Sequence, residues 1–136
     1  MRHPLHPALV HFPIACWSLA VVADFASLQF GELAWRWSCG LLLVGSSTAV
    51  VAMIAGLLER SRVPDGPPLR DTYWHMSAML LAFTLFTTRL LLGLDQWQPV
   101  APDGIALWLD TTGFACLAIG RWLGGRLVYG HGIGQS

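Results

Sequence analysis

The sequence has no lysine and few charged residues of any kind. Only 12% of its 136 residues are charged, against about 25% in a typical soluble domain. Its eight basic residues are all arginine, and eight acidic residues balance them to a formal net charge of zero. A chain without an excess of basic residues gives no reason to expect nucleic-acid binding. The shortage of charge also leaves too little polar surface for a water-soluble domain.

Motifs for redox, metal or hydrolytic chemistry are also absent. There is no Cys-x-x-Cys pair and no Cys-x-x-Cys-His site for a c-type haem. Cys16, Cys39 and Cys116 stand singly in separate apolar runs, which predicts buried thiols without disulfides. The chain contains no phosphate-binding glycine loop, zinc-protease motif, recognisable Ser/His/Asp arrangement or Glu-x-x-His pair. Hydrolytic chemistry therefore has no visible support in the sequence.

What the chain has instead is four long apolar runs. Hydrophobic residues make up 54% of the sequence, and its mean hydropathy is +0.54. The runs cover about residues 7–30, 34–58, 72–94 and 104–129, each long enough for a hydrocarbon layer of about 30 Å. The first lacks a small-residue cleavage pattern, so we expect it to stay attached. Residues 1–136 are predicted to form one integral membrane domain, an all-α, four-helix transmembrane bundle running up-down-up-down.

The arginines indicate how such a bundle is oriented. Four spans place both termini and the second loop on one side of the lipid bilayer. That side carries five arginines, whereas the other side carries one or two arginines and four acidic residues, namely Glu32, Asp95, Asp103 and Asp110. Because positively charged loops stay in the cytoplasm, we expect both termini to be cytoplasmic.

The same connectivity gathers histidines at that end of the bundle. His6 and His11 open the first run, His75 opens the third, and His131 follows the fourth. Imidazole is the commonest metal ligand, and helical bundles build cofactor sites from inward-facing side chains. We predict one b-type haem. Its expected ligands are His11 and His75, whose depths match, with His6 and His131 as alternative ligands or propionate partners.

A haem also needs cations for its propionates and small residues that admit the macrocycle. The candidates for the propionates are Arg60, Arg62, Arg70 and Arg126, of which Arg70 and Arg126 are the predicted partners. The glycines of the second and fourth runs are expected to give the macrocycle room. Two histidine ligands would leave the iron no open position, which favours electron transfer over catalysis.

Other interpretations of the histidines stay open. They can form a hydrogen-bonded cluster in a non-haem accessory subunit of a larger membrane complex. They can also hold zinc together with a carboxylate such as Asp71 or Glu59. A proton or metal-ion pathway through the histidines, Asp24 and Arg89 is the weakest, since the second run offers few polar residues at mid-depth.

Two charges deep in the apolar runs are expected to pair. Asp24 follows His11 by 13 residues, and Arg89 follows His75 by 14. At about 1.5 Å per helical residue, both lie roughly 20 Å from the histidines, near the far face. Since either charge alone in hydrocarbon is costly, we predict a structural ion pair between Asp24 and Arg89.

Several motifs in this order resemble one known family, the domain of unknown function 2231. They are His6-Pro7-x-x-Val10-His11-Phe12-Pro13-Ile14, the aspartate at 24, the histidine at 75, and Gly124-Gly125-x-Leu127-Val128-Tyr129-x-His131-Gly132-Ile133-Gly134. The resemblance covers nearly the whole chain and implies a small, four-span protein of the bacterial inner (plasma) membrane. It also implies that the four histidines and the aspartate are family positions.

The resemblance further favours a redox role. Some relatives are joined to, or encoded with, cytochrome c or Rieske-type modules, which implies electron transfer through haem b in a larger redox complex or a homo-oligomer. The chain departs from the family at the end of its second run. Many relatives carry Gly-x-x-Asp there, whereas this chain has Gly56-Leu57-Leu58-Glu59.

Overall fold

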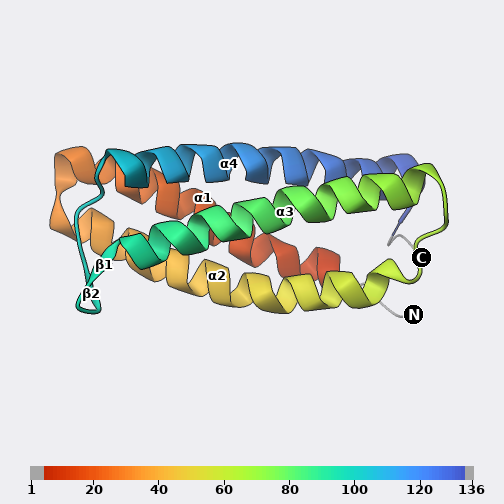
Figure 1. The fold of residues 1–136 in the computed structure, drawn as a ribbon, viewed down its shortest axis with the longest axis horizontal. Coiled ribbons are helices and arrows are strands. Elements are labelled where there is room, and N and C mark those ends of the chain that lie inside the picture. The colour runs from red at the N-terminus through yellow and green to blue at the C-terminus, as the bar shows by residue number, and fades with distance from the viewer. Residues whose placement is uncertain (1–4, 134–136) are drawn as a thin grey trace.

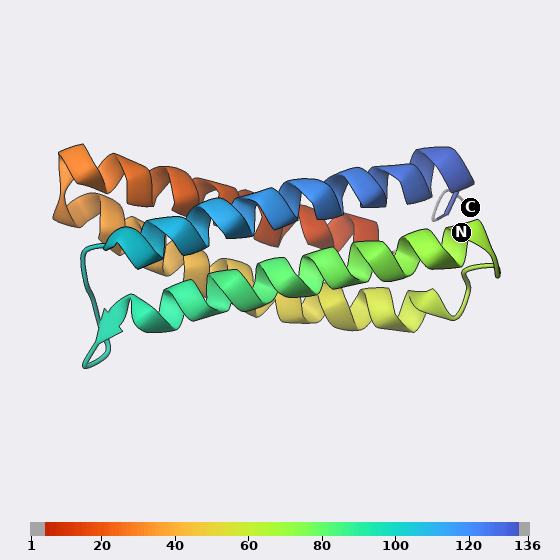
Figure 2. The same cartoon turned by 45° about the horizontal axis from the view of Figure 1, so that its top comes forward.

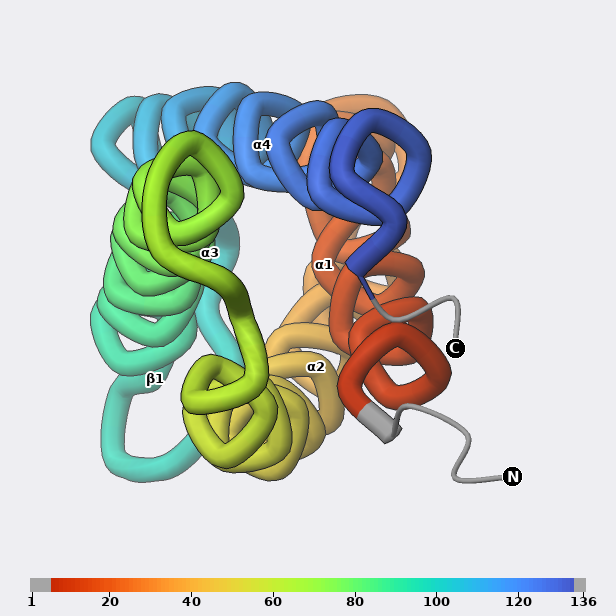
Figure 3. The backbone as a smooth tube through the Cα atoms, turned by 90° about the vertical axis from the view of Figure 1, so that its right-hand side faces the viewer, coloured from red at the N-terminus to blue at the C-terminus, as the bar shows by residue number. Residues whose placement is uncertain are grey.

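Four long helices lie side by side in the computed structural model, which describes residues 5–133 (Figure 1). They are α1 (Leu5–Phe30), α2 (Glu32–Arg60), α3 (Pro67–Leu92) and α4 (Gly104–Gly125), and the last continues into a short π-helix, η1 (Arg126–Gly130). The expected all-α, four-helix bundle is confirmed. α1 packs mainly on α2 and α3 mainly on α4, and the four helices follow one another around the bundle (Figures 2 and 3).

Three of the helices are long and apolar enough to cross a membrane. These are α1 (from His6), α2 and α3, judged by length and composition. α4 is not among the three in the described part of the chain, although the sequence predicted a span at 104–129. The reason lies in its composition, because Asp110, Arg121 and a series of glycines interrupt its apolar residues.

The helices begin and end at other residues than predicted where prolines or a glycine set the helix end. α3 begins at Pro67, earlier than residue 72, because prolines in a first helical turn need no partner for a missing N–H. A single residue, Gly31, separates α1 from α2, and its positive φ of 73° is a conformation that favours glycine. The tight turn makes α1 and α2 an antiparallel pair.

The connection between α3 and α4 holds a two-stranded hairpin that the sequence did not predict. β1 (Leu94–Asp95) pairs antiparallel with β2 (Gln98–Pro99). The two turn residues between the strands have φ values of 47° and 64°, the left-handed pair that matches hairpin twist. The second of them is Trp97, whose side chain is exposed as expected of an interfacial anchor.

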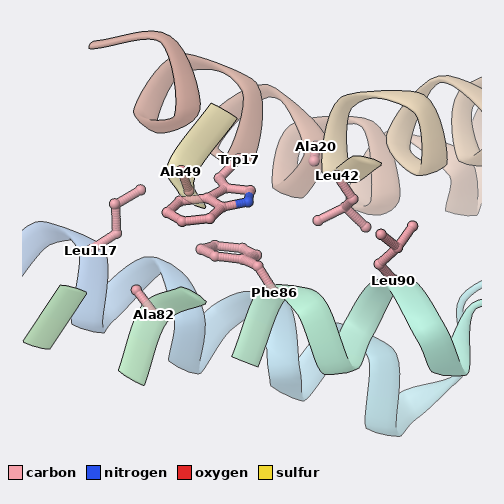
Figure 4. Packing of buried hydrophobic residues seen from close by; sticks show 8 residues of the cluster. All are labelled: Trp17, Ala20, Leu42, Ala49, Ala82, Phe86, Leu90 and Leu117. Atoms are coloured by element: carbon pink, nitrogen blue, oxygen red, sulfur yellow. The ribbon is translucent and has the colours of Figure 1, made fainter. Parts of the chain in front are cut away.

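The bundle core is centred on two stacked aromatic rings. Trp17 of α1 and Phe86 of α3 are almost fully buried, and their ring centroids lie 5.0 Å apart with an angle of 17° between the planes (Figure 4). The indole N–H donates to Ser46 Oγ at 3.3 Å. Beside it, a β-carbon at Gly45 would lie 2.9 Å from Trp17 Cδ1, so only glycine lets α2 approach this closely.

The two ends of the bundle carry different groups. One end holds the starts of α1 and α3, the last turn of α2, and η1; we call it the histidine end (Figure 1). The opposite end holds the α1–α2 turn and the β1–β2 hairpin, and we call it the carboxylate end. The up-down-up-down connectivity therefore collects distant parts of the sequence at each end.

Candidate functional site

A cavity of about 1300 Å³ opens at the histidine end. All four helices and η1 contribute to its walls, and most of the lining side chains are apolar. Trp17 and Met79 line it towards the core, while three histidines and three arginines supply much of its polar lining. These are His6, His11, His75, Arg60, Arg121 and Arg126.

His6 is held against α2 by three features of that helix. Its Nδ1 lies 2.7 Å from the carbonyl oxygen of Ala52, and its backbone N–H donates to Glu59 Oε1 at 3.3 Å. A β-carbon at Gly56 would lie only 2.9 Å from the imidazole ring. Ala52 therefore provides a hydrogen-bond acceptor for the imidazole, and Gly56, one helical turn later, provides the space that the ring fills. We call such a pair of positions the seat of the ring. Glu59 satisfies one of the free N–H groups at the start of α1.

His75 is held against α4 in the same way. Its Nδ1 lies 2.7 Å from the carbonyl oxygen of Gly120, and a β-carbon at Gly124 would lie 3.1 Å from its Cε1 atom. The pattern Gly120-x-x-x-Gly124 repeats the spacing of acceptor and gap seen on α2. Each helix pair thus presents one imidazole on a matching seat.

These hydrogen bonds fix the tautomer of both rings. A carbonyl oxygen only accepts, so each Nδ1 carries a hydrogen, and in the neutral ring Nε2 is left with a lone pair. Within residues 5–133, neither Nε2 has a hydrogen-bond partner. An N–H donated to a backbone carbonyl is the arrangement that orients metal-binding histidines in proteins.

The two rings lie close together and nearly at right angles. Their centroids are 6.1 Å apart, and the planes meet at 80°. An imidazole nitrogen lies about 2 Å from a first-row metal ion, which puts two rings on opposite sides of one ion roughly 6 Å apart, centre to centre. The structure therefore brings together His6 and His75, one from each helix pair.

The other two predicted ligands, His11 and His131, do not pair with His75. His11 lines the cavity, but its residue is exposed, and it makes no hydrogen bond or ring contact within the described residues. His131 Nε2 lies 3.1 Å from Asp71 Oδ2 and is therefore engaged by a carboxylate. The structure does not place either of them against His75.

The arginines around the cavity fall into two groups. Arg126 Nη2 lies 3.0 Å from Asp71 Oδ2, and its guanidinium lies 5.2 Å from the centre of the Trp122 ring. Arg60 contacts the hydroxyl of Tyr73, and its guanidinium lies 5.4 Å from the centre of that ring. Both line the cavity. Arg70, predicted beside Arg126, does not line it, and its side chain is 70% exposed.

A family model described as a predicted membrane protein (DUF2231) matches residues 2–136. The chain belongs to the DUF2231 family. No curated protein and no solved structure matches it. The resemblance inferred from the histidine motifs is thus confirmed over almost the full length, and a lipid bilayer is the setting of this DUF2231 protein.

No group of three or more His, Cys, Asp or Glu side chains that could hold a metal ion occurs within the described part of this DUF2231 protein. Two imidazoles complete the coordination of an ion that brings its remaining ligands with it. The macrocycle of a haem supplies four nitrogens in this way, so its iron needs just two side chains.

At the carboxylate end, Asp24 and Arg89 are in contact. Arg89 Nη2 lies 2.8 Å from Asp24 Oδ2, and its Nε donates to the same oxygen at 3.0 Å. Asp110, which the sequence counted among the four acidic residues of this side, lies at this end but inside the bundle. Asp110 is fully buried, and its Oδ2 lies 3.7 Å from Arg89 Nε. The signal in the sequence was its position two turns into α4, level with Arg89 near the end of α3.

Proposed function

We propose that this protein binds one haem b between His6 and His75 and carries electrons in the membrane. The observation that supports this most strongly is the pair of imidazoles from different helix pairs, 6.1 Å apart and nearly perpendicular. Each ring has its Nδ1 bound to a backbone carbonyl and its Nε2 left as a ligand. His6 thus replaces His11, which the sequence predicted as a ligand because its depth in the membrane matches that of His75.

The surroundings of the pair fit a large, flat, mostly apolar group. The cavity of about 1300 Å³ exceeds the roughly 300–1,000 Å³ of common small-molecule pockets. Gly56 and Gly124 keep both imidazoles seated close to the helices, where a β-carbon would push them into the cavity. The apolar walls exclude water from the macrocycle.

The charges near the cavity suit the two propionates of a haem. Arg126 and Arg60 come from opposite sides of the histidine end, and both line the cavity. Each guanidinium is oriented by an aromatic ring, Trp122 for Arg126 and Tyr73 for Arg60. Arginine binds carboxylates through paired N–H donors, so these two residues are the proposed propionate partners. Arg70 is not included because it does not line the cavity.

A haem iron held by two histidines supplies one-electron redox chemistry without an open position for substrate. The chain's own contribution is to orient both rings and keep water out. Larger redox membrane complexes are the proposed partners of such a carrier. The arginine-rich histidine end is the proposed cytoplasmic end of a multi-pass protein in the bacterial inner membrane.

The test is the visible spectrum of the protein purified after expression with added haem precursor. The wild-type protein is expected to bind about one haem per chain and to show b-type bands on reduction with dithionite. His6→Ala and His75→Ala are expected to lose the bands, because each removes one of two ligands.

His11→Ala is the matched control, since it removes a third histidine of the same cavity that makes no polar contact within residues 5–133. It is expected to keep the bands. A wild-type protein without bands would favour the alternative, an accessory subunit with hydrogen-bonded histidines. Loss of the bands in His11→Ala, with bands retained in His6→Ala, would reject the proposed ligand pair.

A further inference from the structure

The carboxylate end holds three buried charged side chains whose charges do not balance. Asp24 and Asp110 have no exposed surface, and Arg89 is 3% exposed. They come from α1, α4 and α3 respectively, so the cluster lies where three helices meet. With both carboxyls ionised, one guanidinium would leave a net charge of −1 inside the bundle.

No other cation compensates this charge among the described residues. Arg89 is the ion-pair partner of both carboxylates, and Arg36 at the same end pairs with Glu32 at 2.7 Å. From α2, the thiol of Cys39 lies within electrostatic reach of Asp24 and Arg89 and carries no positive charge. An uncompensated charge inside the bundle is strongly unfavourable, so a positive species is needed to balance the cluster.

The oxygens of the cluster indicate which species this is. Asp24 Oδ1 and both carboxyl oxygens of Asp110 are buried and receive no hydrogen bond. The nearest oxygens of the two carboxyls nevertheless approach the same atom, Arg89 Nε, at 3.0 Å for Asp24 and 3.7 Å for Asp110. Ionised carboxylates only accept, so two of them cannot bond unless one carries a proton. One proton turns Asp110 into a donor to Asp24 and cancels the excess charge.

We propose that Asp24, Arg89 and Asp110 form a binding site for one proton, shared by the two carboxyls and held mainly by Asp110. Asp24 stays ionised because it receives the two closest contacts from Arg89, at 2.8 and 3.0 Å. Arg89 Nε is 3.7 Å from Asp110, too far for a hydrogen bond. The site lies roughly 20 Å from His75, at about 1.5 Å per residue along α3, and is independent of the haem proposal.

Infrared spectroscopy of the full chain in detergent, labelled with ¹³C-carboxyl aspartate, tests this directly. A protonated carboxyl has a carbonyl stretch well separated from the carboxylate bands, and the label distinguishes aspartate from glutamate. The wild-type protein at neutral pH is expected to show one such band, shifted in D₂O. Asp110→Asn is expected to lose it while keeping the wild-type melting temperature, since an amide also donates to Asp24.

Asp103→Asn is the matched control, because Asp103 caps the start of α4 and accepts from the Ala106 N–H at 2.8 Å. It is expected to keep the band. A wild-type protein with no protonated aspartate would overturn the proposal, as would a band that survives in Asp110→Asn. A melting temperature that rises with sodium in the wild type but not in Asp110→Asn would also overturn it, by showing that a metal cation balances the cluster.

Discussion

The two ends of the bundle treat their polar groups in opposite ways. At the histidine end, two imidazole rings are each hydrogen-bonded to one backbone carbonyl and line a cavity of about 1300 Å³. At the carboxylate end, three charged side chains pack against one another with almost no exposed surface. The first arrangement leaves ligand atoms and space for another group, whereas the second is nearly complete in itself. Function is therefore expected from the first end, and stability from the second.

The largest expected effect on folding comes from Asp24→Ala. The substitution removes both short contacts of the buried Arg89, at 2.8 and 3.0 Å, and the remaining carboxyl, Asp110, is 3.7 Å away, too far to replace those hydrogen bonds. Breaking a buried ion pair costs about 3–5 kcal/mol, so most of the folded protein is expected to be lost. Membrane yield and thermal unfolding in detergent measure this.

His75→Ala is the corresponding change at the other end. It removes one hydrogen bond to Gly120, worth about 1 kcal/mol, at the edge of an existing cavity. The apoprotein is expected to stay folded. Equal destabilisation by the two substitutions would contradict the division of roles between the ends.

A smaller effect is expected from two neighbouring glycines. A β-carbon at Gly124 would lie 3.1 Å from His75, whereas one at Gly125 meets no atom within 4 Å. Gly124→Ala displaces a ligand ring and is expected to weaken haem binding about tenfold, equal to about 1.4 kcal/mol. Gly125→Ala is expected to leave affinity unchanged and to stabilise α4 slightly. Haem titration of both apoproteins checks the difference. Equal affinities would show that the space at Gly124 does not matter for how His75 binds haem.

The smallest effect concerns two arginines that the sequence grouped together. Arg126 lies 3.0 Å from the buried carboxylate of Asp71, whereas Arg70 lies 3.9 Å from it and is largely exposed. Arg126→Gln is expected to cost the apoprotein about 1 kcal/mol, and Arg70→Gln about 0.5 kcal/mol or less. Thermal unfolding of the two apoproteins separates them. A larger loss from Arg70→Gln would contradict the assignment of Arg126 to the cavity wall.

The architecture was predictable because it depends on features that a sequence displays. Four apolar runs separated by Pro- and Gly-rich loops predict four helices, and their even number brings His6, His75 and His131 to one end. The start of α3 and the hairpin were not predicted. The former depends on prolines that occupy a first turn, and the latter on two residues that adopt positive φ without glycine or asparagine.

The ligand pair was harder to predict because depth and direction are separate properties of a helical residue. His11 matches His75 in depth, but the step of five positions from His6 to His11 rotates the side chain by about 140° around α1, at 3.6 residues per turn. The matching seats, Ala52-x-x-x-Gly56 and Gly120-x-x-x-Gly124, were visible as small-residue motifs. Which imidazole each one accepts depends on how the helices pack.

The electron paramagnetic resonance spectrum of the oxidised, haem-loaded protein tests the central claim most directly. It reports the axial ligands of the iron and the angle between their planes. The angle of 80° between His6 and His75 predicts a low-spin, strongly anisotropic signal dominated by one low-field feature. A high-spin signal, or the rhombic low-spin signal of two parallel imidazoles, would contradict ligation by this pair in this geometry.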